Sequence, residues 1–285
     1  MTEVSFAGRD GNRLAADAAG PEDGPPVVLL HGGGQTRHSW GTTASVLAGK
    51  GWRAYSLDLR GHGGSDWVAV GDYTMEAFAG DVAAVVASLG RPAALVGASL
   101  GGLASLAAIG GGAPATSLVL VDVAPRTQQS GRDRIGEFMM EHMDDGFASL
   151  EEVADSIARY NPHRPRPKDL SGLKKNLRRR DGRWFWHWDP AFIRGGLGSS
   201  DETRTSIIDP ESLEVLARRV TVPVLVVRGL VSDLLTEDGA RRLLALVPHG
   251  EMVTVSGAGH MVAGDRNDVF NDAVVGFLSR SLAPE

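Results

Sequence analysis

The sequence predicts an α/β fold in which a mostly parallel sheet of eight strands is flanked by helices. Short apolar runs alternate with helical stretches along most of the 285 residues, as in chains that build a covered parallel sheet. The runs are apolar throughout, which is typical of strands buried on both faces. Many of the 37 glycines are clustered, and several directly follow these runs. A chain of this length can bury such a sheet in one large domain.

The individual elements follow from the same pattern. Two short stretches, 4–6 and 13–18, are expected to pair as antiparallel strands at one edge of the sheet. Helical character marks the segments between the runs, where glycine and proline are placed at the ends. The apolar runs expected as central strands are 27–30, 53–59, 93–96, 117–123, 223–227 and 252–255, and the expected helices are 40–49, 74–89, 100–109, 237–247 and 262–282.

The alternation stops between residues 126 and 218. This stretch has helical periodicity and several prolines but no strong strand run. Parallel sheets accept insertions at the carboxyl ends of their strands, where ligand sites also form. We therefore expect a core domain of residues 1–125 and 219–285, with a mostly helical cap domain of residues 126–218 inserted after the sixth strand.

Composition excludes several classes of function. The 29 Lys and Arg against 35 Asp and Glu leave a charge of −6, so we expect neither nucleic acid nor membrane as a partner. There is no cysteine, the histidines lack metal-ligand spacing, and a dinucleotide fingerprint starting at Gly32 fails at Arg37. The sequence predicts no metal and no cofactor, a small-molecule substrate and a cytoplasmic location, and it leaves the oligomeric state open.

A nucleophile is predicted at Ser99. Residues 97–101 read Gly-Ala-Ser-Leu-Gly, between an apolar run and a helical stretch of small residues. A serine on a sharp turn from strand to helix has a strained backbone and needs glycine two residues away on either side. The turn would also direct the N–H of Leu100 at the reacting atoms, close to a helix N-terminus that favours negative charge.

A serine hydroxyl needs a base, and the base needs a carboxylate. His260 follows the last apolar run within a glycine-rich loop, at the same sheet edge as Ser99. Two aspartates end neighbouring runs, namely Asp233 after 223–227 and Asp122 after 118–121. We favour Asp233, because a short loop after the penultimate strand reaches the His260 loop directly. Asp122 is the alternative, with a structural role at the start of the insertion as its other explanation.

The oxyanion of an acyl-transfer reaction needs backbone donors. The first central run ends in His31-Gly32-Gly33-Gly34. We assign the two donors to Gly33 and Leu100, with Gly34 as the alternative to Gly33. His31 is expected to pack beneath this loop and to take no part in catalysis.

Taken together, these motifs resemble the α/β-hydrolase superfamily over nearly the whole chain. The resemblance depends on residues 31–33, on the Asp-Leu-Arg-Gly-His-Gly-Gly-Ser segment at 58–65, on 97–102, on Asp233 and on 259–260. It implies the α/β-hydrolase fold with a cap at 126–218, and a serine-nucleophile member similar to esterases and perhydrolases. Related enzymes with an aspartate nucleophile hydrolyse epoxides or haloalkanes, and the serine at position 99 argues against that chemistry.

The predicted function is hydrolysis of small to medium carboxylic esters through an acyl-enzyme. The cap contains a run of tryptophans at 184–188, which would either line an apolar substrate pocket or only pack between cap and core. Residues expected in the pocket are Gly34, Met139, Trp186, Trp188 and Met261. Two alternatives use the same triad, a hydrolase of carbon–carbon bonds and a cofactor-free perhydrolase, and a third is a ligand-binding protein with slow or no turnover.

Overall fold

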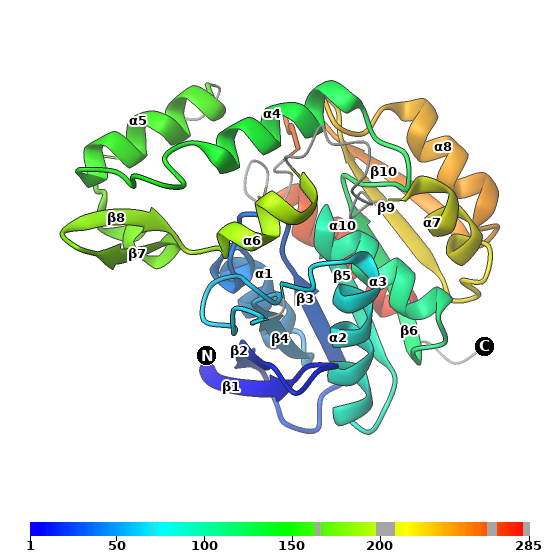
Figure 1. The fold of residues 1–285 in the computed structure, drawn as a ribbon. Helices are drawn as coiled ribbons and strands as arrows, with labels where there is room; N and C mark the ends of the chain where they lie inside the picture. Colours follow the sequence, from blue (N-terminus) through cyan, green and yellow to red (C-terminus); the bar gives the residue numbers. More distant parts are fainter. Residues whose placement is uncertain (70, 163–165, 167, 198–208, 261–266, 282–285) are drawn as a thin grey trace.

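The computed structural model of the chain describes residues 1–69, 71–162, 166, 168–197, 209–260 and 267–281. Within these residues, eight strands form one sheet in the order β1-β2-β4-β3-β5-β6-β9-β10 (Figure 1). The strands β1 and β2 are antiparallel to their neighbours, and the others are parallel. The predicted fold class is confirmed. The strands are β1 (Thr2–Ala7), β2 (Arg13–Ala19), β3 (Pro26–Leu30), β4 (Arg53–Leu57), β5 (Ala93–Ala98), β6 (Ala115–Val121), β9 (Val224–Gly229) and β10 (Gly250–Val255).

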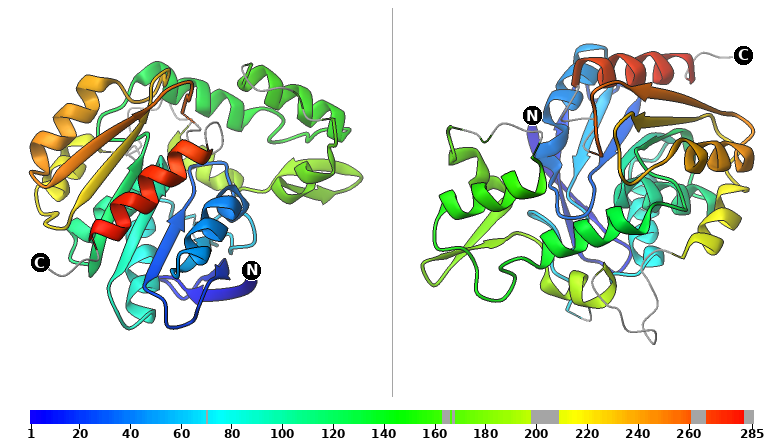
Figure 2. Two further views of the ribbon diagram at one scale, coloured as in Figure 1. Left: turned by 180° about the vertical axis from the view of Figure 1, so that it is seen from behind. Right: turned by 90° about the horizontal axis from the view of Figure 1, so that it is seen from above.

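Helices cover both faces of the sheet. One face carries α2 (Met75–Ser88), α3 (Leu100–Gly110) and α8 (Glu237–Leu246), and the opposite face carries α1 (Gly41–Gly49) and α10 (Asn267–Ser281) (Figures 1 and 2). Successive residues of β3 alternate between the two apolar clusters, with Val28 facing the first face and Leu29 the second. This alternation explains why the central strands are apolar throughout.

Short polar side chains fix where helices begin. Thr74 precedes α2 and accepts a hydrogen bond from the N–H of Ala77, and Thr236 precedes α8 and accepts one from Gly239. Such caps satisfy N–H groups that have no partner inside the helix. Each predicted core helix is present, and the part of the last prediction at 262–266 and 282 lies outside the described residues.

The segment expected as a cap is called the cap below, and its described residues lie at the carboxyl ends of the strands and project to one side of the sheet (Figures 1 and 2). Its elements are α4 (Gln129–Met140), α5 (Leu150–Tyr160), the 3-10 helix η2 (Ser171–Asn176), strands β7 (Leu177–Arg180) and β8 (Arg183–Trp186), α6 (Pro190–Phe192), the π-helical turn η3 (Ile193–Leu197) and α7 (Pro210–Ala217). The last of these packs on core helix α3, where a Cβ at Gly110 would lie 2.5 Å from the carbonyl oxygen of Leu216.

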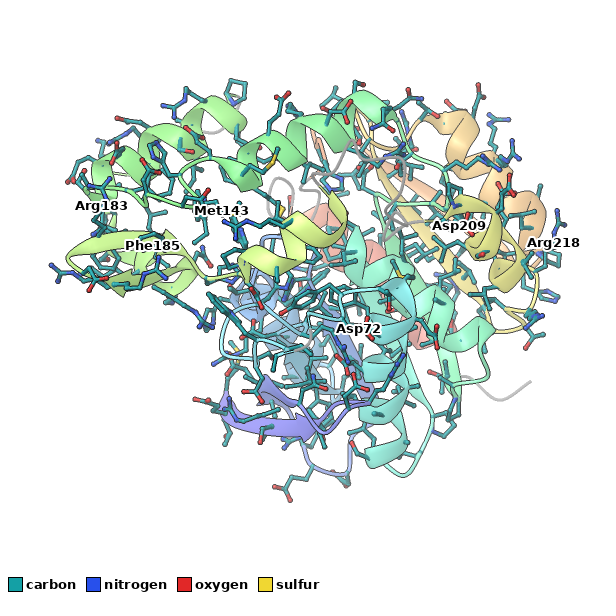
Figure 3. The ribbon with its side chains drawn as sticks, in the orientation of Figure 1. Asp72, Met143, Arg183, Phe185, Asp209 and Arg218 are labelled. Atoms are coloured by element: carbon teal, nitrogen blue, oxygen red, sulfur yellow. The ribbon has the colours of Figure 1, made fainter. Side chains whose placement is uncertain are left out.

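The sequence predicts a mostly helical insertion with no strong strand run, and the structure differs by having the β7–β8 hairpin within it. Figure 3 marks it by Arg183 and Phe185. Its turn is Asp181-Gly182, with φ of 50° and 77°, and this dipeptide favours two-residue hairpin turns. The signal was present, but the strand runs on either side are short and rich in arginine.

No helix in the described part of the chain is long and apolar enough to cross a membrane. The cytoplasmic location remains a prediction.

Candidate active site

Ser99 occupies a strained turn between β5 and α3. Its φ of 45° and ψ of −116° lie outside the regions that side chains favour. A Cβ on Gly97 would lie 2.4 Å from the N atom of Gly102, and one on Gly101 would lie 2.5 Å from the carbonyl oxygen of Leu30. Backbone therefore passes so closely on both sides of the serine that only glycine fits, as the sequence predicted.

His260 lies on the loop after β10, and its side chain is 12% exposed. Its Nδ1 lies 2.9 Å from Oδ2 of Asp122, so the Nδ1–H donates to the carboxylate and Nε2 is left to accept a proton. Ser99 and His260 line the same cavity.

The structure contradicts Asp233 as the partner of His260. Asp233 is instead paired with Arg134 of α4, with an N–O distance of 2.7 Å and a side chain that is 44% exposed. The reason is the course of the loop after β9, which turns back on itself through a hydrogen bond from the N–H of Ser232 to the carbonyl oxygen of Gly229. After this turn, the side chain of Asp233 faces the cap and not His260.

Asp122 is held in place by the neighbouring strand. It is fully buried and has a φ of 50°. Its N–H donates to Val227 at 2.8 Å, and its Oδ1 accepts from the N–H of Gly229 at 3.0 Å. The hydroxyl of Ser232 donates to Oδ2, the oxygen that also faces His260. The hydrogen bonds from Gly229 and Ser232 therefore stabilise the buried carboxylate of Asp122 without an arginine or lysine partner within the described ranges.

Two backbone N–H groups in the cavity wall have no acceptor among the described residues. They belong to Gly33 and Leu100, the residues predicted as oxyanion donors. The alternative donor, the N–H of Gly34, already donates to Nε2 of His62 at 3.2 Å. Within this loop, the geometry favours Gly33 over Gly34.

Three buried histidines, His31, His62 and His187, lie near this loop. The sequence predicted that His31 packs beneath the loop, and it predicted no such contact for His62 or His187. His31 accepts from the N–H of Leu59 at 3.0 Å and contacts the carbonyl oxygen of Gly32 at 2.8 Å. Its ring centroid is 5.2 Å from that of His62, which is 5.8 Å from that of His187 in the cap.

Burial keeps these three imidazoles neutral. Loss of solvation, with the nearby His31 ring as a smaller cause, lowers the pKa of His62 to about 3. Burial lowers the pKa of His31 and brings that of His187 well below its ordinary value. No signal in the sequence pointed to His187, because its neighbours come from segments more than a hundred residues away.

The cavity next to Ser99 has a volume of about 460 Å³ and is mainly apolar. Four of the predicted pocket residues line it, and the fifth, Met261, lies outside the described residues. Trp186 and Trp188 stack with their ring centroids 4.9 Å apart. The predicted residues along the wall are Gly34, Met139, Trp186 and Trp188, joined by Ile135, Phe138, Ile157 and Leu173 of the cap.

Residues 27–273 match the model of the alpha/beta hydrolase family. The chain belongs to this family. It is 32% identical to an esterase of Mycobacterium tuberculosis over 89% of this chain and 83% of that protein. It is 29% identical to the 3-hydroxybutyrate-oligomer hydrolase of Cupriavidus necator over 87% of each. The crystal structure of E-2-(acetamidomethylene)succinate hydrolase superposes with a TM-score of 0.81 at 24% identity, covering 98% of this chain and all of that one.

These findings confirm the predicted superfamily and the prediction of a hydrolytic enzyme. The solved structure, at its low identity, supports the fold alone.

Proposed function

We propose that this α/β hydrolase cleaves carboxylic esters through an acyl-enzyme formed on Ser99. The observation that supports this most is the 2.9 Å contact between His260 and the buried Asp122, at the wall of the cavity that Ser99 also lines. The similarity to curated proteins named as an esterase and an oligomer hydrolase supports ester bonds as the target.

In the proposed reaction, His260 Nε2 accepts the hydroxyl proton of Ser99 as Oγ attacks the ester carbonyl. The N–H groups of Gly33 and Leu100 stabilise the negative oxygen of the tetrahedral intermediate. His260 then protonates the leaving alcohol, and a water activated by the same ring releases the acid. Asp122 fixes the tautomer of His260 and stabilises its cation.

The cavity supports an acyl or alcohol group of small to medium size. Its wall is mainly apolar, and two stacked tryptophans form part of it. Polar side chains, among them Gln35, Arg132 and Asn161, also line the cavity. Apolar pockets of this volume bind by excluding water, with few polar contacts to fix orientation. The same triad would also serve a perhydrolase or a hydrolase of carbon–carbon bonds.

The first experiment measures initial rates on nitrophenyl esters of increasing acyl length, with Ser99→Ala in parallel. We expect turnover in the wild type and a fall in kcat of about 10⁶ in the variant, because the triad acts as a unit. Turnover that survives in Ser99→Ala would refute the proposal. Hydrogen peroxide competing with water for the acyl-enzyme would identify a perhydrolase. No ester turnover in the wild type would favour a carbon–carbon hydrolase or a ligand-binding protein, and turnover of a ring-cleavage diketone would identify the former.

The acid is tested by a matched pair of variants. In Asp122→Asn the side chain keeps its shape but favours the wrong tautomer of His260, so we expect kcat to fall by about 10⁴. In Asp233→Asn only a half-exposed ion pair with Arg134 is lost, and we expect kcat within about twofold of the wild type, since such pairs contribute little. A larger fall in kcat for Asp233→Asn than for Asp122→Asn would assign the acid of the triad to Asp233.

A further inference from the structure

We propose that His187 of the cap is a positioning residue for the oxyanion loop (residues 31–34), so that its ring couples the seat of the cap to the geometry of the oxyanion hole. This inference rests on the proposed function, because it assumes that Gly33 supplies an oxyanion donor. It concerns a residue that does not touch the reacting atoms.

Two neighbouring imidazoles contact the backbone of Gly34, one at its N–H and the other at its carbonyl oxygen. The N–H of Gly34 donates to Nε2 of His62 at 3.2 Å, and its carbonyl oxygen lies 3.3 Å from Nε2 of His187. The other nitrogen of His62 contacts the carbonyl oxygen of Arg60 at 2.9 Å, and that of His187 accepts from the N–H of Gly63 at 2.8 Å. These partners define one tautomer for each ring, with Nδ1–H on His62 and Nε2–H on His187.

This arrangement limits the orientation of the peptide that follows Gly33. The N–H of Gly34 belongs to the Gly33–Gly34 peptide, which is next to the peptide whose N–H would hold the oxyanion. Gly34 has a φ of 74°, and a Cβ there would lie 3.1 Å from Cε of Met139 and 3.3 Å from the ring of Trp188. The loop is therefore held by hydrogen bonds along its backbone and bounded by cap side chains on its outer side.

The segment that carries His187 is itself fastened to the core. The N–H of Asp189 donates to the carbonyl oxygen of Gly61 at 2.8 Å, and Tyr73 donates to the carboxylate of Asp189 at 2.6 Å. The indole of Trp67 donates to the carbonyl oxygen of His187 at 3.3 Å. These contacts bind the cap to the core, and the Nε2 of His187 extends them to the backbone of the oxyanion loop.

Two substitutions at position 187 separate the two contacts of the ring. Asn places its amide near the Nδ1 position, so His187→Asn can keep the contact with Gly63 but loses the one with Gly34. Gln places its amide near the Nε2 position, so His187→Gln can keep the contact with Gly34 but loses the shorter one with Gly63. A residue that only joined cap and core would therefore tolerate Asn better than Gln.

We expect the opposite order. A displaced oxyanion donor costs about 10²-fold in rate, so His187→Asn should lower kcat by about 10- to 100-fold with KM changed less than about threefold. His187→Gln should recover most of that loss. The inhibition constant of a trifluoromethyl ketone, whose adduct with serine carries the oxyanion, should rise in His187→Asn by the factor by which kcat/KM falls.

Ser99→Ala in the same assay separates the two proposals. If that variant retains turnover, the proposed function fails. If it is inactive while His187→Asn equals the wild type, or is less impaired than His187→Gln, only the positioning role fails. Should His187→Asn not fold, the pair His62→Gln and His62→Asn tests the other backbone contact of Gly34, the hydrogen bond from its N–H to His62. Gln can keep the acceptor for the Gly34 N–H and Asn cannot. The proposal assumes that the hydrogen bonds of Gly34 position the oxyanion loop, so kcat in His62→Asn equal to or above that in His62→Gln would refute it.

Discussion

Acidification from pH 7 to pH 5 is expected to destabilise the fold because it must charge buried imidazoles. His31, His62 and His187 are each at most 2% exposed, and their hydrogen bonds fit the neutral rings. In the unfolded chain the same side chains are solvated and titrate near pH 6.5. As the pH falls, the unfolded state gains protons that the folded state does not accept.

The magnitude follows from His62. The pKa of His62 is about 3 in the folded protein and 6.5 in the unfolded chain. Between these two pH values the unfolded state binds one proton more than the folded state, so the free energy of unfolding decreases as the pH decreases. The contribution is fully present above pH 6.5. From pH 7 to pH 5, His62 alone removes about 2 kcal/mol, at 1.36 kcal/mol per unit below 6.5. His31 and His187 add losses of the same sign, because their pKa values are also lowered.

Urea unfolding at pH 7 and pH 5 measures this loss. His62→Gln can keep an acceptor for Gly34 without a titratable ring, so its loss between the two pH values should be smaller than that of the wild type by about 2 kcal/mol. Phe192→Leu is the matched control, since Phe192 packs on the same ring with centroids 4.8 Å apart and carries no charge. It should lower stability equally at both pH values.

The pH range from 7 to 5 lies above the range in which most carboxylates take up protons. For Glu141, burial alone would raise the pKa, but hydrogen bonds from Ser156 and Arg159, with the nearby positive charge, together outweigh burial and lower it. The contribution of such a group is lost only as the pH falls below about 4.5. Equal losses in the wild type and in His62→Gln would refute the argument that these rings are held neutral by burial.

Two further predictions concern the fold around the site. In Gly101→Ala the added methyl carbon would lie 2.5 Å from the carbonyl oxygen of Leu30, so we expect about 1–3 kcal/mol of destabilisation and loss of ester turnover, measured by urea unfolding and initial rates; unchanged stability would contradict it. Arg60→Met leaves the 2% exposed carboxylate of Asp81 without its bidentate partner at 2.6 and 2.7 Å. We expect a cost of about 3–5 kcal/mol in urea unfolding, and a loss under 1 kcal/mol would count against it.

The parts of the fold and site that the sequence predicted are those encoded locally. A buried strand is recognisable from its own apolar run, and Ser99 from the glycines that its turn requires within two residues. His260 was found because the loops after parallel strands share one edge of the sheet. Each of these inferences used only a short segment and the order of the strands.

The parts that were missed depend on the path of a loop or on contacts between distant segments. Asp122 and Asp233 both follow strands that end at the same edge, and β6 and β9 are neighbours in the sheet. Which aspartate faces His260 depends on a turn at Ser232 that sends Asp233 toward Arg134. No periodicity predicts that turn.

The two halves of the proposed site depend differently on the cap. Asp122 precedes the first cap helix by only a few residues, but its N–H and its Oδ1 are both bonded to the β9 strand, at Val227 and Gly229. These bonds isolate the acid from movements of the segment that follows it. The oxyanion loop, in contrast, contacts the cap through His187. A change that loosens the cap should therefore reduce stabilisation of the oxyanion before it disturbs the pairing of His260 with its carboxylate.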